Sequence, residues 1–298
     1  MKHIVLKGLF VLWPEWVLAC DGDCGSKWAL LNPRGPIAAH EKGLIITAFA
    51  LMLLVVVPVI FMTIAFAWKY RASNNDASYA PKWDNSTKIE AVVWTVPAVI
   101  VAILAALVWK SSHELSPYRP IASAAKPVQV EVVSMNWKWL FIYPDLGIAS
   151  VNRLVIPAGV PVSFRITSDA VMSSFFIPQL GGQIYAMAGM QTRLQLVADQ
   201  PGSYQGLNTQ FSGDGFAGMH FETVAASNQD FDAWVAQVRH SSMPLSEDAF
   251  KALEIPSENV PPRYFSSVEP QLFERIMQKY LPNADATRSG HRGMHSAM

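Results

Sequence analysis

The chain has 298 residues, of which 51% are hydrophobic and 15% are charged, and this is more apolar than an average soluble protein. The formal net charge is zero, which argues against nucleic acid or any strongly charged partner. Both cysteines, Cys20 and Cys24, lie near the N-terminus, so a disulfide framework in the remainder of the chain is excluded.

Residues 1–19 are typical of a secretory signal, because basic residues are followed by a short apolar run and a small residue. The run ends in Ala-Cys, which resembles a bacterial lipoprotein box and predicts that Cys20 is lipidated as the first residue of the mature chain. Pro14 and Glu15 interrupt the apolar run, so an ordinary signal peptide or a misassigned start is an alternative. On the first interpretation, residues 20–42 form a periplasmic N-terminal segment.

Two uncharged runs follow, Gly43–Trp68 with 26 residues and Ala91–Trp109 with 19 residues. Roughly 20 apolar residues are enough for a helix to cross a bilayer. Trp68 and Trp109 lie at the ends of these runs, where aromatic belts form at the membrane surface. The pattern predicts a transmembrane hairpin over residues 43–114.

The orientation of this hairpin follows from the basic residues around it. The connecting loop 69–88 has four, whereas residues 25–42 have three and residues 110–125 have two. The positive-inside rule therefore slightly favours a cytoplasmic loop. An exported N-terminus gives the same orientation, so we expect both termini in the periplasm.

The pattern changes to short strands after a linker rich in proline and alanine. Turn residues separate the predicted strands, which are Val128–Val133, Arg153–Ile156, Val160–Thr167, Ser174–Ile177, Arg193–Ala198 and Gly218–Ala225. Strands at this spacing predict an all-β sandwich or small barrel over residues 115–227. The periodicity does not give the strand order.

Residues 228–281 are expected to form a short helical extension. Asn228–His240 and Ser246–Leu253 have helical patterns, and each is opened by a residue that can cap a helix. From residue 282 to residue 298 the chain is polar and rich in small residues, and we expect this tail to be disordered.

A glycine-rich stretch, Tyr204–Phe221, is predicted to be a loop between two strands of the β domain. Copper held by thiolate and imidazole needs several such groups at one point. Between Leu115 and Ser227 there is no cysteine, and His220 is the only histidine. His220 and Met219 are neighbours in a predicted strand, so their side chains are expected on opposite faces. The loop is therefore expected to hold no metal.

The same stretch resembles the loop G-x-C-x-E-x-C-G-x-x-H-x-x-M of subunit II of the haem–copper terminal oxidases, which holds a dinuclear copper. Gly206 and Gly213 match this loop, and Pro178-Gln179-Leu180-Gly181 matches the segment after an upstream histidine ligand. The six ligand positions fall on Ser173, Asn208, Gln210, Ser212, Phe216 and Met219. Only the methionine is kept, and this pattern resembles the cytochrome o type ubiquinol oxidases, whose subunit II lacks the copper.

Three other stretches are similar to that branch, namely Phe66–Asn74, Glu90–Pro97 and Gln183–Met190. The resemblance runs from about Ala29 to Tyr280. It implies a cupredoxin-like periplasmic domain followed by an aromatic-rich extension, in a bacterial inner membrane. It also implies a proton-pumping complex that oxidises ubiquinol and reduces dioxygen to water. The implied partners are subunit I, which holds the haems and copper, other small membrane subunits and the lipid bilayer, and this chain has no redox centre of its own.

Glu90 lies one residue before the second uncharged run, at the end predicted to face the cytoplasm. Acidic residues near the bilayer often mark proton routes. From the residues alone, the alternative is a solvated acid favoured at a helix start by the helix dipole. The resemblance favours the first interpretation, because a Glu in Lys-x-Glu-x-x-x-Trp-Thr lies at the mouth of a proton channel of subunit I in that family.

Two tryptophans, Trp137 and Trp139, are predicted at the end of the first strand of the β domain. Alternation places both on one face of the strand, and we expect them to pack the domain on a partner subunit. Four methionines, Met172, Met187, Met190 and Met219, are expected to fill gaps in packing rather than to bind a metal. No catalytic group is predicted in this chain.

Two alternatives remain open on this pattern. The first is a copper-bearing cytochrome c oxidase subunit II, against which the lost ligand positions argue directly. The second is a membrane-anchored cupredoxin-like lipoprotein that binds or assembles other components and has no oxidase partner. An anchor alone needs neither a second span nor Glu90, which argues against this class.

Overall fold

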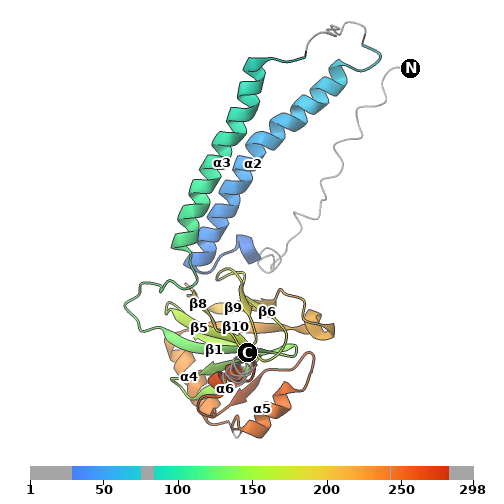
Figure 1. Ribbon diagram of the computed structural model, residues 1–298. Coiled ribbons are helices and arrows are strands. Elements are labelled where there is room, and N and C mark those ends of the chain that lie inside the picture. The colour runs from blue at the N-terminus through green and yellow to red at the C-terminus, as the bar shows by residue number, and fades with distance from the viewer. Residues whose placement is uncertain (1–28, 75–83, 242, 282–298) are drawn as a thin grey trace, which may run out of the picture.

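The computed structural model describes residues 29–74, 84–241 and 243–281 (Figure 1). The predicted signal peptide, Cys20 and the predicted tail 282–298 lie outside the described residues.

A membrane hairpin forms one end of the molecule (Figure 1). After a short helix η2 (Ala29–Leu31), it consists of α2 (Pro36–Lys69) and α3 (Thr87–Glu114), which are 34 and 28 residues long. Both helices are apolar and long enough to cross a bilayer, and Ala38 is the one residue of the two helices that is buried in this chain. The two helices therefore require lipid or other protein around them.

Two sheets form a β-sandwich at the other end. The first has the order β11-β3-β2-β1-β5-β8, in which only β1 and β5 are parallel. Its strands are β1 (Val128–Met135), β2 (Lys138–Tyr143), β3 (Ile148–Val151), β5 (Val162–Ser168), β8 (Thr192–Leu196) and β11 (Arg263–Phe265).

The second sheet has the order β4-β10-β9-β6-β7, with β4 and β10 parallel. Its strands are β4 (Arg153–Pro157), β6 (Ser173–Phe176), β7 (Ile184–Ala186), β9 (Gly202–Asn208) and β10 (His220–Ala226). Aromatic rings from both sheets fill the space between them. Phe175 and Phe221 stack with their centroids 5.1 Å apart, and Trp139 meets both rings edge to face. Phe175 of this aromatic core is paired in the sheet with Asn208, the last residue of β9.

The C-terminal extension adds helices α4 (Asn228–Arg239), α5 (Glu247–Glu254) and α6 (Leu272–Gln278). The hydroxyls of Ser227 and Ser246 cap the first two helices by accepting backbone hydrogen bonds. Residues from α5, β11 and α6 form a second core against the outer face of the first sheet, which contributes Val133, Met135, Leu140, Ile142, Ala149 and Val151. The first sheet is thus covered on both faces.

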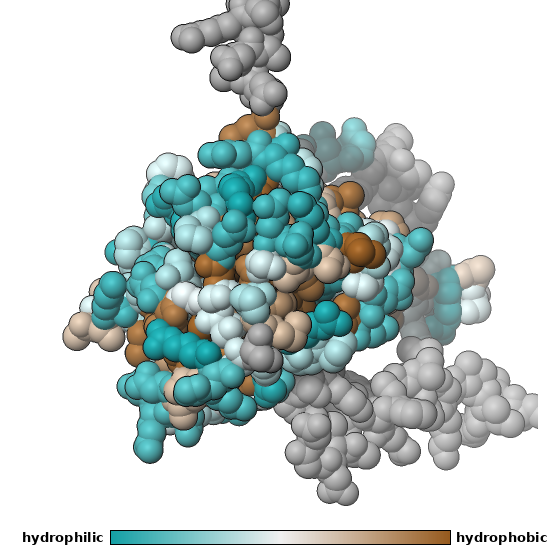
Figure 2. Space-filling view, turned by 90° about the horizontal axis from the view of Figure 1, so that it is seen from below, coloured by the Kyte–Doolittle hydropathy of each residue, from teal (hydrophilic) through white to brown (hydrophobic). Residues whose placement is uncertain are grey.

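The hairpin and the sandwich meet at the start of α2. Arg34 pairs with two turns of the sandwich, because its N–H donates to the carbonyl of Gln179 (2.7 Å) and its carbonyl accepts from Asp199 (2.8 Å). The carboxylate of Glu41 accepts a hydrogen bond from the N–H of Gly182. The opposite face of the sandwich, away from the hairpin, is mostly hydrophilic (Figure 2). The molecule therefore has an apolar end, a hydrogen-bonded joint and a polar end.

All six predicted strand segments overlap strands of the sandwich, and the two predicted extension helices are present. The prediction that the loop begins at Tyr204 is wrong, because β9 continues to Asn208 and pairs with both β6 and β10. Strand β2 was not predicted, because all six of its residues are buried and its sequence does not alternate.

Candidate functional site

The candidate site lies at the end of β9, where the loop 209–219 leads into β10. This loop contains a short 3-10 helix, η3 (Asp214–Gly218). In the sheet, Phe175 of β6 pairs with Asn208 of β9, and Leu207 pairs with His220 of β10. Strand register therefore brings the start of β6 and both ends of the loop to one point.

Asn208 joins these segments through its side-chain amide. Its Oδ1 accepts from the N–H groups of Ser174 (2.9 Å) and Gln210 (3.1 Å). Its Nδ2 lies 3.1 Å from the hydroxyl of Ser212 and 3.2 Å from the sulfur of Met219. Both Asn208 and Met219 are buried. One neutral side chain thus holds the start of β6 and both ends of the loop together.

The other predicted positions are placed differently. Ser173 is buried beside this cluster, but its hydroxyl donates to the carbonyl of Val171 (3.4 Å). Phe216 packs on Phe211, with ring centroids 5.6 Å apart, and Phe211 is 71% exposed. The structure therefore brings together Asn208, Ser212 and Met219, and it joins Gln210 to them only through its backbone.

These side chains do not fit a copper ion. The cluster offers one thioether, one carboxamide and one hydroxyl, whereas a copper relay needs thiolates and imidazoles. The amide Nδ2 is a donor, and it occupies the contact with the sulfur that a metal would need. Among the described residues there is no group of three or more His, Cys, Asp or Glu side chains that could hold a metal.

Trp137 lies over the loop, in the turn between β1 and β2. Its backbone has a φ of 62°, its indole Nε1 donates to the carbonyl of Ser212 (3.0 Å), and its ring packs on Gly213 and Gly215. A Cβ atom at Gly215 would lie 2.4 Å from the indole, so only glycine fits there. The prediction that Trp137 shares a strand face with Trp139 is wrong, because Trp137 is in a left-handed turn.

Trp139 lies inside the sandwich and has no exposed surface. Its ring contacts Phe175 and Phe221 at 5.5 and 5.6 Å between centroids. The expectation that Trp139 packs on a partner subunit is therefore wrong, since strand β2 turns this side chain into the core of its own domain.

Glu90 lies at the other end of the molecule, in the first turn of α3. Its side chain is exposed, and it has no ion-pair partner among the residues that the structure describes. The hairpin separates it from the sandwich (Figure 1), so Glu90 and the loop are separate features.

Two charged groups inside the sheet were not predicted. Lys138 is 1% exposed and donates to the carbonyls of Leu253 (2.8 Å) and Ile255 (2.7 Å), and burial lowers its pKa. Glu131 is paired with Arg165 at 2.7 Å, yet burial raises its pKa to about 7. Lys138 is followed by a continuous apolar run, which is a signal that both faces of its strand are covered. Glu131 lies in the alternating stretch Val-Gln-Val-Glu-Val, so the sequence does not indicate that its side chain is covered.

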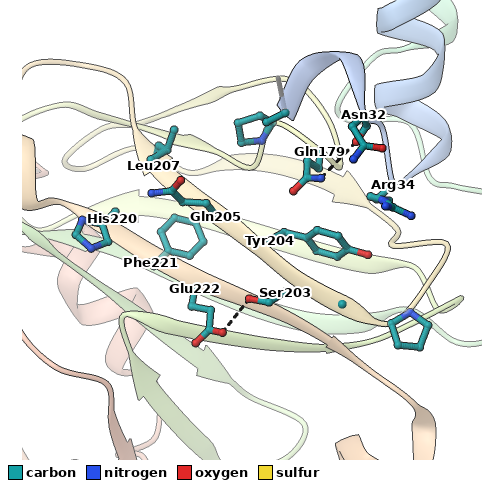
Figure 3. Close-up of a pocket in the computed structure, with 14 residues that line it drawn as sticks. Asn32, Arg34, Gln179, Ser203, Tyr204, Gln205, Leu207, His220, Phe221 and Glu222 are labelled. Atoms are coloured by element: carbon teal, nitrogen blue, oxygen red, sulfur yellow. Dashed lines mark hydrogen bonds between the residues drawn. The ribbon is translucent and has the colours of Figure 1, made fainter. Parts of the chain in front are cut away.

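A groove of about 580 Å³ lies on the outer face of β9 and β10 (Figure 3). His220, Gln205 and Glu222 line it, and the hydroxyl of Ser203 donates to Glu222 (2.8 Å). His220 points into this groove whereas Met219 points into the core, as the alternation predicted. None of the six positions of the resemblance lines the groove.

Two protein-family models match this chain, over the sandwich and over the C-terminal extension. Residues 144–224 match the family described as cytochrome c oxidase subunit II, periplasmic domain, and residues 239–283 match the COX aromatic rich motif. The chain is 54% identical over 272 residues to the cytochrome bo(3) ubiquinol oxidase subunit 2 of Pseudomonas aeruginosa, covering 91% of this chain and 82% of that protein. It is 50% identical to the ubiquinol oxidase subunit 2 of Acetobacter aceti, covering 86% of this chain and 84% of that protein.

Among solved structures, the chain is similar to the periplasmic domain of subunit II of the cytochrome oxidase of Bradyrhizobium japonicum. That similarity has 22% identity and a TM-score of 0.36, and it covers 39% of this chain and 96% of that one.

Proposed function

Because the chain belongs to the ubiquinol oxidase branch of the haem–copper oxidase subunit II family, we propose that it supports a quinol-oxidising terminal oxidase without carrying a redox centre of its own. In this proposal the haems and the copper are in subunit I. The complex oxidises ubiquinol, reduces dioxygen to water and pumps protons. This chain supplies a membrane anchor and a periplasmic cap.

The observation that carries this proposal is the cluster around Asn208. Asn208 itself stands at a ligand position of the copper relay, and its amide bonds the side chains of Ser212 and Met219 at two others, so a neutral amide takes the place of metal and thiolate. Ubiquinol reaches an oxidase through the membrane, so a periplasmic relay that accepts electrons from a soluble protein is unnecessary. A loop without copper ligands is therefore consistent with an oxidase that takes its electrons from quinol in the membrane.

The chain is placed in the inner membrane with both termini in the periplasm. The match of residues 144–224 to a periplasmic domain supports a periplasmic sandwich, and two spans return the chain to the side of the membrane from which it started. The start of α3 then faces the cytoplasm, and Glu90 lies at that boundary. Its exposed carboxylate can deliver protons to a route that begins in subunit I.

The sandwich is proposed to dock on subunit I through its uncharged end. Residues 170–191 and 200–213 contain no charged residue. They carry the exposed side chains of Val171, Tyr185 and Phe211. Gly182, in the first of these segments, contacts α2 by donating its N–H to Glu41. Binding to a bilayer surface usually adds basic residues to an apolar face. None is present in these segments, which favours a protein partner.

Purification of the intact complex through this chain tests the proposal. We expect haem-bearing subunit I to copurify and the complex to consume oxygen with quinol but not with reduced cytochrome c. A chain that purifies without haem and without oxygen consumption would overturn the proposal and favour an anchored lipoprotein.

A further inference from the structure

Two loops adjoin the segments that Asn208 holds together. The upstream loop, residues 169–172, leads into β6, and the downstream loop, residues 209–219, joins β9 to β10. In a metal site the ion itself cross-links the segments that carry its ligands and adds to their stability. Here the direct links are weaker, since they come from one neutral amide and one thioether.

The C-terminal extension contacts the downstream loop through the turn between β1 and β2. Within that turn, Trp137 binds the loop by donating to the carbonyl of Ser212. Its neighbour Lys138 binds the extension by donating to the carbonyls of Leu253 and Ile255. In addition, the side chain of Asn259 packs directly on Gly218, where a Cβ atom would lie 2.8 Å from Oδ1.

The end of the extension contacts the upstream loop. Lys279 donates to the carboxylate of Asp169 at 2.9 Å, and the side chain of Asp169 is 2% exposed. The hydroxyl of Tyr280 lies 2.9 Å from the carbonyl of Asp169 and 3.1 Å from its carboxylate. Tyr280 also packs on Gly189, which follows β7.

One residue joins the two contact regions. The carboxylate of Glu254 accepts from Lys279 at 2.7 Å, and the carbonyl of Glu254 lies 3.5 Å from the side-chain nitrogen of Asn136 in the β1–β2 turn. A continuous series of contacts therefore runs from Ser212 through Trp137 to Glu254, Lys279 and Asp169.

We infer that the extension holds the upstream and downstream loops in position and so takes over the cross-linking role that a bound metal has in a copper-binding loop. The links made by Lys138 and Lys279 are charge-assisted, and charge-assisted hydrogen bonds are stronger than the neutral amide contacts of Asn208. The bond from Lys138 to Leu253 is buried, whereas Lys279 is half exposed and reaches the buried side chain of Asp169. The inference concerns the internal structure of the chain, so it does not depend on the proposed oxidase function.

Hydrogen–deuterium exchange of the purified complex tests this inference. Lys279→Met removes the bonds to Asp169 and Glu254 but keeps most of the apolar stem. We expect peptides from both loops to exchange several-fold faster, because the half-exposed ammonium of Lys279 is screened by solvent but its loss leaves the buried carboxylate of Asp169 without its ion pair. Tyr280→Phe, which keeps the ring and removes only the hydroxyl, is expected to give a smaller change in the upstream loop.

Lys251→Met is the matched control. It removes an exposed ion pair with Glu247 in the same extension but contacts neither loop. We expect wild-type exchange in both loops. The inference is overturned if Lys279→Met speeds exchange only within residues 272–281, or if Lys251→Met changes the two loops as much as Lys279→Met does.

Discussion

The side-chain nitrogen of Asn208 lies 3.2 Å from the sulfur of Met219. These two residues come from opposite ends of the loop between β9 and β10, and both are buried. The contact shows how a loop with the spacing of a copper site is closed without a metal. The carboxamide of Asn208 bonds the N–H groups of Ser174 and Gln210 and contacts the side chains of Ser212 and Met219, so these polar groups have partners in the absence of a metal.

Replacing Asn208 with Ala should therefore destabilise the sandwich. The variant leaves the buried N–H of Ser174 without its acceptor, and an unsatisfied buried group costs about 1–3 kcal/mol. We expect a lower midpoint of thermal unfolding, followed by tryptophan fluorescence of the purified complex. Ser203→Ala is the control, because it removes one exposed hydrogen bond to Glu222. Equal midpoints for the two variants would contradict the role given to Asn208.

Glu131 should make stability depend on pH. Burial raises its pKa to about 7 from the usual value of 4.5, so the folded chain binds this proton more tightly than the unfolded chain. Ionisation of Glu131 therefore costs stability as the pH rises from about 4.5 to about 7, and the cost is complete above that range. In Glu131→Gln the side chain cannot ionise.

Unfolding midpoints of wild type and Glu131→Gln at pH 5 and pH 8 check this prediction. We expect the variant to be more stable relative to wild type at pH 8 than at pH 5. The opposite order would mean that the ion pair with Arg165 outweighs burial.

Glu90→Gln tests the proposed proton entrance. We expect a several-fold fall in quinol oxidation rate with haem content unchanged, because a carboxamide cannot carry a proton. Glu90→Asp should retain part of the rate. Glu114→Gln, at the other end of the same helix, is the control and should behave as wild type. If both glutamine variants lose activity equally, Glu90 has no special role at this boundary.

Photo-crosslinking tests the proposed docking end. A photoreactive residue at Met190, which is 54% exposed, is expected to cross-link to subunit I in the membrane. The same group at Met243, which is 50% exposed on the extension, should not. Cross-links from Met190 to lipid alone would show that this end rests on the bilayer instead.

Much of the fold could be predicted because its signals are local. The two uncharged runs are long, and most strands have turn residues at their ends. Strand β2 could not, because the extension covers its outer face and removes the alternation. The positive φ of Trp137 likewise depends on the loop packed below it, which no local pattern reports.

The candidate site was only partly predictable for the same reason. The loss of copper ligands can be read directly from residue types, but the role of Asn208 depends on the register of β6, β9 and β10. Lys138 and Glu131 have no motif around them, and their partners are far apart in the sequence.

The central claim is that this loop carries no redox metal, and the copper content of the purified complex tests it most directly. Copper should be measured by elemental mass spectrometry and expressed per haem-bearing complex, and a visible spectrum should be recorded on the same sample. We expect a single copper per complex, which belongs to subunit I. Two additional copper ions, with the absorption of a dinuclear copper–thiolate centre, would contradict the account and require ligands other than those around Asn208.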